Sequence, residues 1–393
     1  MIWKKVALGD IASNIQTGPF GSQLHQSDYS KEGTPVVMPK DLVNGHISES
    51  SIARVSEDHV NRLSRHKIEV GDILYSRRGD VGRCAFATDL EQGWLCGTGC
   101  LRVTIDSSKA VPKFVFYQLQ KAETVGWVEK HAVGATMLNL NTSILSSIPI
   151  EMPSIEEQQI IVDMLSAYDD LIENNQKQIK LLEEAAQRLY KEWFVDLRFP
   201  GHETTPITDG ILEGWKEGII QDVVVYHDKK RKPLPGMQRA EMQGQYRYYG
   251  AASILDYVND YLFDGTYLLL GEDGTVVTED GFPILQYVTG KFWVNNHAHV
   301  LTGQPDYPTE YLYMMFKATK VKDVVTGAAQ PKISQARLSN KKMIIPCKEL
   351  VRAYCDQVNP IFKQILNLEQ QIILHKEARD RLLPKLMSAE IEV

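Results

Sequence analysis

The chain has 393 residues, of which 43% are apolar and 24% are charged, the composition of a globular protein with about two or three domains. It has no run of about 18 uncharged apolar residues and no signal-peptide pattern, so we expect no membrane span and place it in the cytoplasm. The five cysteines are scattered, which predicts reduced thiols. Cys96 and Cys100 lack a second pair at zinc-ligand spacing, so we expect no metal.

The net charge of −7 is unevenly distributed along the chain. Residues 154–194 hold nine acidic and four basic residues, so most of the acidic excess lies in one segment. The remainder is near neutral and contains local basic clusters. Because phosphate contacts depend on local charge, the acidic total does not exclude a nucleic-acid partner.

Residues 1–153 combine short apolar runs with many turns, which predicts a first α+β domain. The loop QTGPFGSQL (16–24) offers glycine N–H groups to phosphates and amide and hydroxyl groups to base edges; a plain turn is the alternative. The segment SRRGDVGR (76–83) follows a predicted strand and is either a phosphate contact or a solvated loop. The candidate DNA-contacting residues of this domain are Gln16, Thr17, Gly18, Ser22, Gln23, Lys40, Arg77, Arg78 and Arg83.

Residues 154–194 are predicted to form one long helix. Ser154 and Glu157 make a capping box after Pro153, and the Pro200-Gly201 pair ends any continuation. Forty residues at the helical rise span about 60 Å, more than one compact domain needs. The apolar residues follow a heptad seam with one polar member: Leu165, Tyr168, Ile172, Asn175, Ile179, Leu182, Ala186, Leu189 and Trp193.

A linker (195–214) leads to a second predicted α+β domain, residues 215–346. Its basic run DKKRKP is a phosphate contact or a solvated surface, and the rings of QYRYYGAAS belong to the core or stack on DNA. In NNHAH, His297 and His299 share one face of a strand, but no carboxylate or cysteine partner is evident, so we expect no metal. The candidate DNA-contacting residues of this domain are Lys229, Lys230, Arg231, Lys232, Arg247, Tyr248, Lys291, Asn296, Gln330 and Lys332.

A second long helix is predicted over residues 347–390. Its seam is less apolar: Val358, Ile361, Ile365, Leu368, Ile372, His375, Arg379, Leu382 and Leu386. We expect Pro360 to kink the helix or delay its start, and Pro384 to weaken its last turn.

The chain contains an internal repeat. A gapless offset of 193 aligns residues 134–194 with 327–387 and preserves the apolar pattern. The loops GATMLNLN (134–141) and GAAQPKIS (327–334) are equivalent, and they either touch the DNA backbone or simply turn the chain. Weaker similarity relates the segments at Trp3 and Trp215 and those at Gly71 and Gly265. The helical frame therefore repeats, while the globular surfaces differ.

The two helices have complementary charge, because residues 347–387 hold seven basic and five acidic residues. We therefore expect an antiparallel coiled coil with approximate two-fold symmetry and a globular part at each end. The alternative is that each helix packs only on its own domain. Two globular domains held apart in this way could each contact one of two half-sites on the same face of duplex DNA.

Catalytic motifs are not evident. The chain has no GxxxxGK[ST] loop, no GxGxxG after a strand, and no Asn/Asp-Pro-Pro-aromatic tetrapeptide, which favours binding over catalysis. The rival hypotheses are a stand-alone DNA methyltransferase or nuclease with a fused reader, and a coiled-coil scaffold or decoy with no DNA role.

These motifs resemble the specificity subunit of type I restriction–modification systems, over essentially the whole chain. The carrying segments are QTGPFGSQL, GTPVVMPKDL, GDILYSRRGDVGR and above all the long segment that begins IPIEMPSIEEQQIIVDML and contains the first helix; the weaker second copy, ending in HKEARDRLLPKLM, also fits. The resemblance implies a non-catalytic subunit whose two target-recognition domains read a bipartite double-stranded DNA site. It also implies that the helices dock two modification subunits, which methylate adenine with S-adenosylmethionine, and that restriction subunits add ATP- and Mg-dependent translocation and cleavage. No cofactor is expected on this chain.

Overall fold

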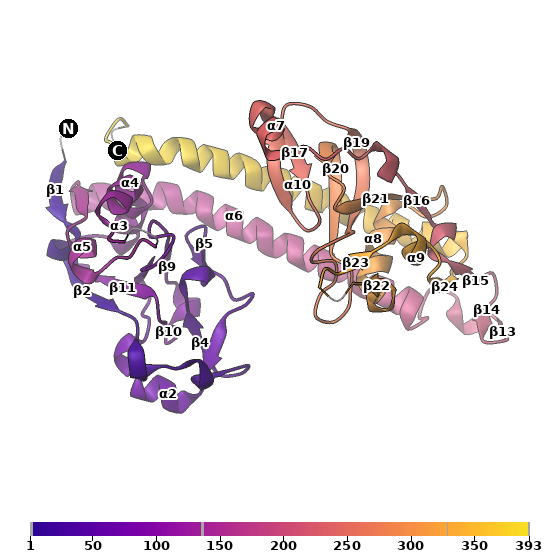
Figure 1. Cartoon of the computed structure of the whole chain (residues 1–393), viewed down its shortest axis with the longest axis horizontal. Helices are drawn as coiled ribbons and strands as arrows, with labels where there is room; N and C mark the ends of the chain where they lie inside the picture. Colours follow the sequence, from indigo (N-terminus) through magenta and orange to yellow (C-terminus); the bar gives the residue numbers. More distant parts are fainter. Residues whose placement is uncertain (1–2, 135–136, 328, 392–393) are drawn as a thin grey trace. The chain divides into compact units, whose positions relative to one another are not determined.

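The computed structural model describes residues 3–134, 137–327 and 329–391 (Figure 1). The chain divides into two compact units, one formed by Met1–Glu173 with Ile372–Val393 and the other by Asn174–Gln371. Two long helices, α6 (Ile155–Tyr190) and α10 (Lys348–Met387), each contribute residues to both units. Within the described residues, no helix is long and apolar enough to cross a membrane.

Unit 1 is built on two four-stranded sheets. The main sheet is antiparallel, in the order β2 (Ala12–Thr17), β11 (Cys100–Ile105), β8 (Ile73–Ser76) and β9 (Cys84–Phe86). The other sheet has the order β10 (Leu95–Cys96), β4 (Thr34–Val37), β7 (Ala53–Val55) and β3 (Tyr29–Ser30). Two strand pairs complete the unit, namely β1 (Lys4–Ala7) with β12 (Pro149–Met152) and β5 (Leu42–Val43) with β6 (His46–Ile47).

The shorter helices of unit 1 pack with the main sheet, except for the one that carries Val60, which packs with the second sheet. They are α1 (Leu8–Ile11), α2 (Glu57–Arg62), α3 (Pro112–Leu119), α4 (Ala122–His131) and α5 (Thr142–Ser146). One apolar cluster buries Tyr75 and Leu101 of the sheet, Phe114 of α3, Leu165 of α6 and Leu386 of α10. The long helices are therefore part of the core of this unit.

Unit 2 contains one six-stranded sheet. Its order is β16 (Val224–Tyr226), β21 (Ala298–Gly303), β19 (Phe263–Gly271), β20 (Leu285–Val294), β17 (Gln243–Tyr249) and β18 (Ile254–Val258). The strand pairs are β13 (Ile207–Thr208) with β14 (Ile211–Leu212), β15 (Lys216–Ile219) with β24 (Lys342–Ile345), and β22 (Val325–Thr326) with β23 (Lys332–Ile333). Its shorter helices are α7 (Gly236–Glu241), α8 (Thr309–Ala318) and α9 (Gln335–Ser339).

The segment expected to be a linker is packed into unit 2. A π-helical turn (Lys191–Val195) follows α6, and Phe199 and Leu212 are buried in the main apolar cluster of the unit. The rings of Phe199 and Trp215 stack with centroids 6.2 Å apart. The segment packs against unit 2 because the apolar side chains of Phe199, Leu212 and Trp215 are part of its core.

The internal repeat is confirmed at the level of single residues. The offset of 193 maps α5 onto α9, β12 onto β24 and the start of α6 onto the start of α10. The N-cap side chains of Asn141 and Ser334 are equivalent and accept from equivalent backbone N–H groups. The strand order β2-β11-β8-β9 of unit 1 also recurs as β16-β21-β19-β20 in unit 2.

The repeat preserves one strained turn. Gly134 and Gly327 both adopt positive φ, and a Cβ at either position would lie 2.2 or 2.4 Å from the carbonyl oxygen of Met137 or Gln330. Glycine is required there because the backbone turns back on itself. The neighbouring positions 135, 136 and 328 lie outside the described residues.

The predicted antiparallel pairing of the long helices is confirmed within each unit. In unit 1, Arg379 of α10 contacts Asp169 of α6 at 2.9 Å. In unit 2, the Asn175 amide donates to Gln371 at 3.1 Å. In the same unit, the Tyr354 hydroxyl of α10 donates to Ala186 O of α6 at 3.0 Å. Within unit 2 the numbering thus rises on one helix as it falls on the other, so each helix packs on its partner as well as on its own domain.

The polar members of the predicted seams all have partners. Arg379 is paired with Asp169 and Asp380, and the His375 ring lies 6.3 Å from that of Tyr168. None of the predicted seam residues is exposed, while most of their neighbours on the helix surface are.

The expectation that Pro360 delays the start of the helix is wrong. Helix α10 begins at Lys348 and continues through Pro360, so its start is not delayed. The adjacent side chains of Val358 and Phe362 are buried in the core of unit 2, and this packing offsets the backbone hydrogen bond that proline removes. Pro384 likewise lies inside the helix, whose last residues Leu386 and Met387 are buried.

Candidate nucleic-acid interface

In unit 1, the loops predicted to contact DNA meet at one end of the main sheet. The Gly18 N–H, after β2, donates to Cys100 O at 2.9 Å. The Arg77 N–H, after β8, donates to Gly99 O, and Arg77 O accepts from Leu140 N–H, both at 2.8 Å. The described parts of the sequence segments 16–24, 76–83 and 134–141 are therefore brought together, along with the turn 97–99, which sequence reasoning did not select.

Several predicted contact residues hold this end of the sheet in shape. Gly18 is buried, and a Cβ there would lie 2.0 Å from Gly97 O. The Gln16 amide donates to Arg65 O at 2.5 Å, and Gln23 Oε1 accepts from the backbone N–H of Phe20. Thr17 is half-buried, and the side chain of Ser22 lies outside the described residues. These groups support the loops whatever else they contact.

Among the predicted basic residues of unit 1, Arg77 and Arg78 are the ones whose side chains have neither an ion pair nor a hydrogen bond in the described part of the chain. Arg78 is exposed, and the buried Arg77 Nε has no hydrogen-bond partner there. Arg83 is held by Asp80 at 2.8 Å, and Lys40 donates to Ser51. The exposed guanidinium of Arg78 is a group that a phosphate or a guanine would satisfy.

The same region has a positive electrostatic environment. Burial, together with the charges of the nearby Arg65 and Arg102 guanidinium groups, lowers the pKa of His66 to about 4. Arg102 is itself buried and paired with Asp72 at 3.4 Å. His66 is therefore neutral at physiological pH, and the arginines supply the charge.

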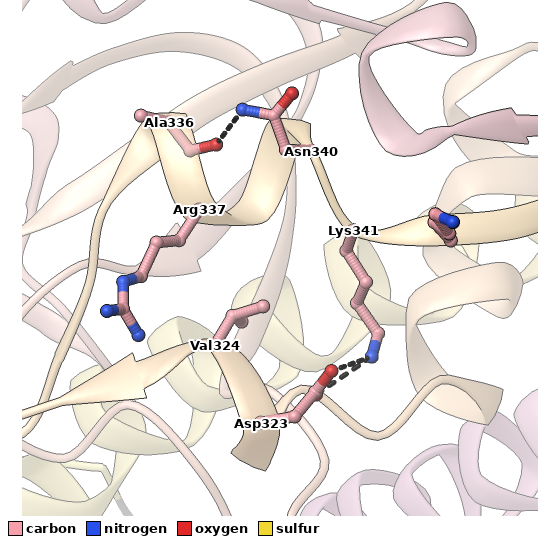
Figure 2. A pocket seen from close by; sticks show the side chains of 7 residues that line it. Asp323, Val324, Ala336, Arg337, Asn340 and Lys341 are labelled. Carbon is pink, nitrogen blue, oxygen red and sulfur yellow. Dashed lines mark hydrogen bonds and ion pairs between the residues drawn. The ribbon is translucent and has the colours of Figure 1, made fainter.

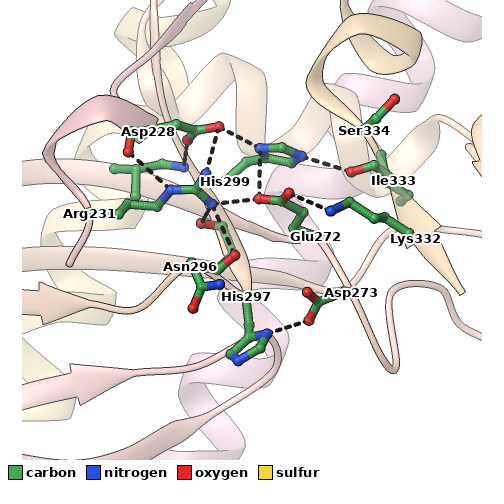
Figure 3. A network of polar contacts seen from close by, with 12 residues as sticks. Asp228, Arg231, Glu272, Asp273, Asn296, His297, His299, Lys332, Ile333 and Ser334 are labelled. Atoms are coloured by element: carbon green, nitrogen blue, oxygen red, sulfur yellow. Dashed lines mark hydrogen bonds and ion pairs between the residues drawn. The ribbon is translucent and has the colours of Figure 1, made fainter. Parts of the chain in front are cut away.

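In unit 2, the equivalent end of the sheet carries a network of charged side chains (Figure 3). Arg231 lies 2.6 Å from Glu272, which also contacts Lys332 at 3.2 Å. His299 is buried and contacts Asp228 at 2.6 Å. The residues come from β21, the turn after β16, the loop after β19 and β23, so the fold assembles distant parts of the sequence.

The loops that follow β8 and β19 are equivalent but carry opposite charges. Leu140 N–H donates to Arg77 O in unit 1, and Ile333 N–H donates to Glu272 O in unit 2. In the same register, the backbone of Arg78 forms a β-bridge with that of Asn139, and the backbone of Asp273 forms the equivalent β-bridge with that of Lys332. The two basic residues of unit 1 are thus replaced by two acidic residues in unit 2.

The acidic residues of this network stay ionised. Burial raises the pKa of Asp228, but hydrogen bonds from His299 and the Val300 N–H and the Arg231 charge outweigh it, leaving the pKa below its ordinary value. Burial also raises the pKa of Glu272, but the hydrogen bond from Arg231 and the neighbouring positive charges outweigh burial and leave this pKa below its ordinary value.

Asp228, Glu272 and His299 offer ligand atoms within 4.8 Å of one another, which is close enough to hold a metal ion. Arg231 and Lys332 already compensate the two carboxylates, however, and would repel a divalent cation. We therefore assign this cluster as an ion-pair network.

The structure corrects some predicted residues of unit 2. Arg231 is the centre of the network, so it is not a free phosphate ligand. Tyr248 is 1% exposed, and its hydroxyl accepts from Leu234 N–H, so the ring belongs to the core and cannot stack on a base. The exposed members of the set near the network are Lys229, Lys230, Lys232, Asn296, Gln330 and Lys332.

Two predicted residues lie outside the network. Lys291 is exposed and places its ammonium 4.6 Å from the ring of Tyr261, and Arg247 contacts the Tyr249 hydroxyl. Sequence reasoning missed Asp228, Glu272 and Asp273. It found the two histidines but no carboxylate partner for them, although the structure supplies one for each. The alternation of His297 and His299 was the only sequence signal of this network, because the carboxylates that bind the two histidines lie far away in the sequence.

A separate pocket of about 570 Å³ in unit 2 is shown in Figure 2, between the turn at Asp323 and α9. Lys341 pairs with Asp323 at 2.6 Å, and the Asn340 amide donates to Ala336 O. Because these groups satisfy one another, we assign no ligand to it.

Each long helix also carries an exposed patch that the repeat preserves. In unit 2, a hollow of about 390 Å³ is lined in part by Leu181, Glu184, Ala185 and Arg188 of α6. In unit 1, α10 carries the same residue types at the equivalent positions Leu374, Glu377, Ala378 and Arg381. We call these two sets the helix patches. Leu181 is 64% exposed and Leu374 is 53% exposed.

A family model described as the type I restriction modification DNA specificity domain matches residues 2–184 and 212–381. The chain belongs to this family. The two matches follow the internal repeat, one for each globular part with its helix. Membership confirms the interpretation of the sequence as a non-catalytic DNA-recognition subunit of a type I restriction–modification system, and it does not favour a stand-alone methyltransferase, a nuclease or a scaffold.

Relatives match most of the chain. The MjaIX specificity subunit of Methanocaldococcus jannaschii is 27% identical over 389 residues, covering 91% of this chain and 87% of that protein. The HindI specificity subunit of Haemophilus influenzae is 28% identical over 213 residues, covering 53% of this chain and 44% of that protein. The crystal structure of the type I S subunit from M. genitalium has the same fold, with a TM-score of 0.57 and 18% identity over 98% of this chain and 96% of that chain.

The charged network of unit 2 predicts a division between structural and exposed cations. We expect Arg231→Met to lower the free energy of unfolding by about 2–4 kcal/mol, because two mostly buried carboxylates lose the guanidinium that they share and keep Lys332 and His299 as ion-pair partners. Lys230→Met, at an exposed position, should change it by less than about 0.5 kcal/mol. Urea unfolding followed by circular dichroism measures both.

The pH dependence of this loss has a defined sign. The carboxylates have lowered pKa values, so the Arg231 contribution is present at neutral pH and is lost as the pH falls through those values. The difference between Arg231→Met and the wild type should therefore shrink below about pH 4. If Arg231→Met and Lys230→Met lowered the free energy of unfolding equally at neutral pH, Arg231 would not be the centre of a buried ion-pair network.

Proposed function

We propose that this chain reads a bipartite double-stranded DNA site, with unit 1 contacting one half-site and unit 2 the other. The observation that carries the proposal is that equivalent ends of the two sheets have the same backbone construction but different chemistry. In unit 1 the end carries Arg77 and Arg78; in unit 2 it carries Glu272 and Asp273. A duplicated frame with different reading groups suits a DNA sequence whose two parts differ.

Phosphate and base contacts divide between different residues in this proposal. In unit 1, the exposed Arg78 and the half-buried Arg77 supply positive charge near the DNA backbone. In unit 2, the exposed Lys229, Lys230 and Lys232 take that role. The phosphate contacts set affinity and register, and the neighbouring polar groups read bases.

The helix patches support docking of two copies of one partner. The core seam explains why buried residues repeat, but the patches are exposed, and packing alone does not require them to remain identical. Each combines an exposed leucine with a Glu–Arg pair four residues apart, at 4.0 Å in α6 and 3.7 Å in α10. We assign them to two modification subunits, one at each patch.

The remaining roles belong to partner subunits in this proposal. The modification subunits bind S-adenosylmethionine, and the restriction subunits use ATP and Mg for translocation and cleavage. The assembled complex acts on DNA in the cytoplasm. This chain supplies the sequence specificity and the docking frame.

Removing the basic pair of unit 1 tests the DNA proposal. Arg77→Ala with Arg78→Ala should weaken binding of the assembled complex to all DNA sequences and reduce the slope of log K against log salt by up to about 2. Arg83→Ala is the matched control, since Asp80 already holds that guanidinium. Binding measured by fluorescence anisotropy over a salt series gives both quantities. An unchanged slope in the double variant would remove the pair from the interface.

The helix patches predict a change of stoichiometry. Leu181→Asp or Leu374→Asp should leave one modification subunit on each chain, and the double variant should leave none, because a charge then lies in an apolar contact. Leu171→Asp is the control: it is exposed on α6, but its repeat counterpart is Gln364. Native mass spectrometry reports the composition. Two modification subunits on the double variant would contradict the assignment.

A further inference from the structure

The backbone of His297 is fixed in unit 2 between β20 and β21. Its N–H donates to Oδ1 of the buried Asn295 at 2.8 Å, and its carbonyl accepts from Glu272 N–H at 2.8 Å. The side chain nevertheless remains 48% exposed. An imidazole held rigidly at the surface is placed to contact something outside the chain.

The orientation of this imidazole is set by a carboxylate. Nδ1 lies 2.5 Å from Asp273 Oδ1, and Figure 3 shows the ring turned toward Asp273 on that side. Because an ionised carboxylate only accepts hydrogen bonds, Nδ1 carries the proton. In the neutral ring, Nε2 then presents a lone pair, and it has no partner within the described ranges.

The other histidine of the pair has a different environment. His299 is 1% exposed, and its two nitrogens contact Asp228 and the carbonyl of Ile333. It is a structural residue with both ring nitrogens satisfied. The contrast shows that the open Nε2 of His297 is not a general property of this network.

The chemistry of an acceptor limits what it reads. In the major groove, adenine N6 and cytosine N4 are donors, whereas guanine O6 and N7 and thymine O4 are acceptors. A neutral Nε2 therefore suits an amino group and does not suit a phosphate. At the position equivalent to Asp273, unit 1 has Arg78, which is a donor.

From this geometry we propose that His297, oriented by Asp273, accepts a hydrogen bond from the exocyclic amino group of an adenine or cytosine in the half-site read by unit 2. The inference rests on the proposed DNA-recognition function and names a specificity-determining residue within it. His297 is the contacting residue and Asp273 is a positioning residue. The lysines at 229, 230 and 232 bind the backbone and carry no base preference.

The test uses the complete complex in its host, with methylated adenines mapped across the genomic DNA. His297→Ala should make one base position of one half-site degenerate. The preference for the recognised base over the other bases at that position should fall from about 10- to 100-fold to about twofold or less. Asp273→Asn should also relax that position, because an asparagine both donates and accepts and so permits either tautomer of His297. The other half-site should be unchanged in both variants.

Controls separate this inference from the proposed function and from misfolding. Lys229→Ala with Lys230→Ala should reduce methylation of all target sites evenly and leave the motif intact. Thermal unfolding shows whether each variant is folded. If His297→Ala does not fold, the isosteric variant Asp273→Asn provides the test instead.

Folded variants with an unchanged motif would overturn the role of His297. A wild-type motif with no bipartite form would instead overturn the proposed function.

Discussion

The antiparallel seam between α6 and α10 is the interaction on which the rest of the structure depends. Isolated helices gain little stability in water, so these two need a partner along their apolar faces. In unit 1 the seam buries Leu165 and Leu386, and in unit 2 it buries Val358 and Leu368. Fully burying each such side chain contributes about 1.5–3 kcal/mol. Because both globular cores also include these residues, neither core is complete without the pair of helices.

Polar groups within the seam fix its register. The Asn175–Gln371 hydrogen bond and the Asp169–Arg379 ion pair each require one alignment, since a shift by one turn would leave a partly buried polar group unpaired. The duplicated segments around the seam keep equivalent turns and caps, whereas the loops at the ends of the sheets do not keep their charge. The frame is therefore constrained by packing, and the recognition surface is free to differ between the units.

Patterns of local origin were predictable from the sequence. The heptad seam, the capping box at Ser154 and the internal repeat follow from spacing, and the structure contains all three. Features that depend on tertiary contacts were not predictable. Pro360 lies within a helix because its neighbours are buried, and Arg231 looks like surface charge in DKKRKP but meets Glu272, forty-one residues away. The partners of His297 and His299 were missed for the same reason.

Chemical cross-linking of the seam tests this account most directly. With Cys347→Ser in place to remove the half-exposed native thiol, Asn175→Cys and Gln371→Cys place two thiols where the structure has a 3.1 Å hydrogen bond. A short bifunctional thiol reagent should then link residues 175 and 371 within one chain, as peptide mass spectrometry of the monomer band would show. Links found only between chains, or none in a folded protein, would contradict the antiparallel pairing.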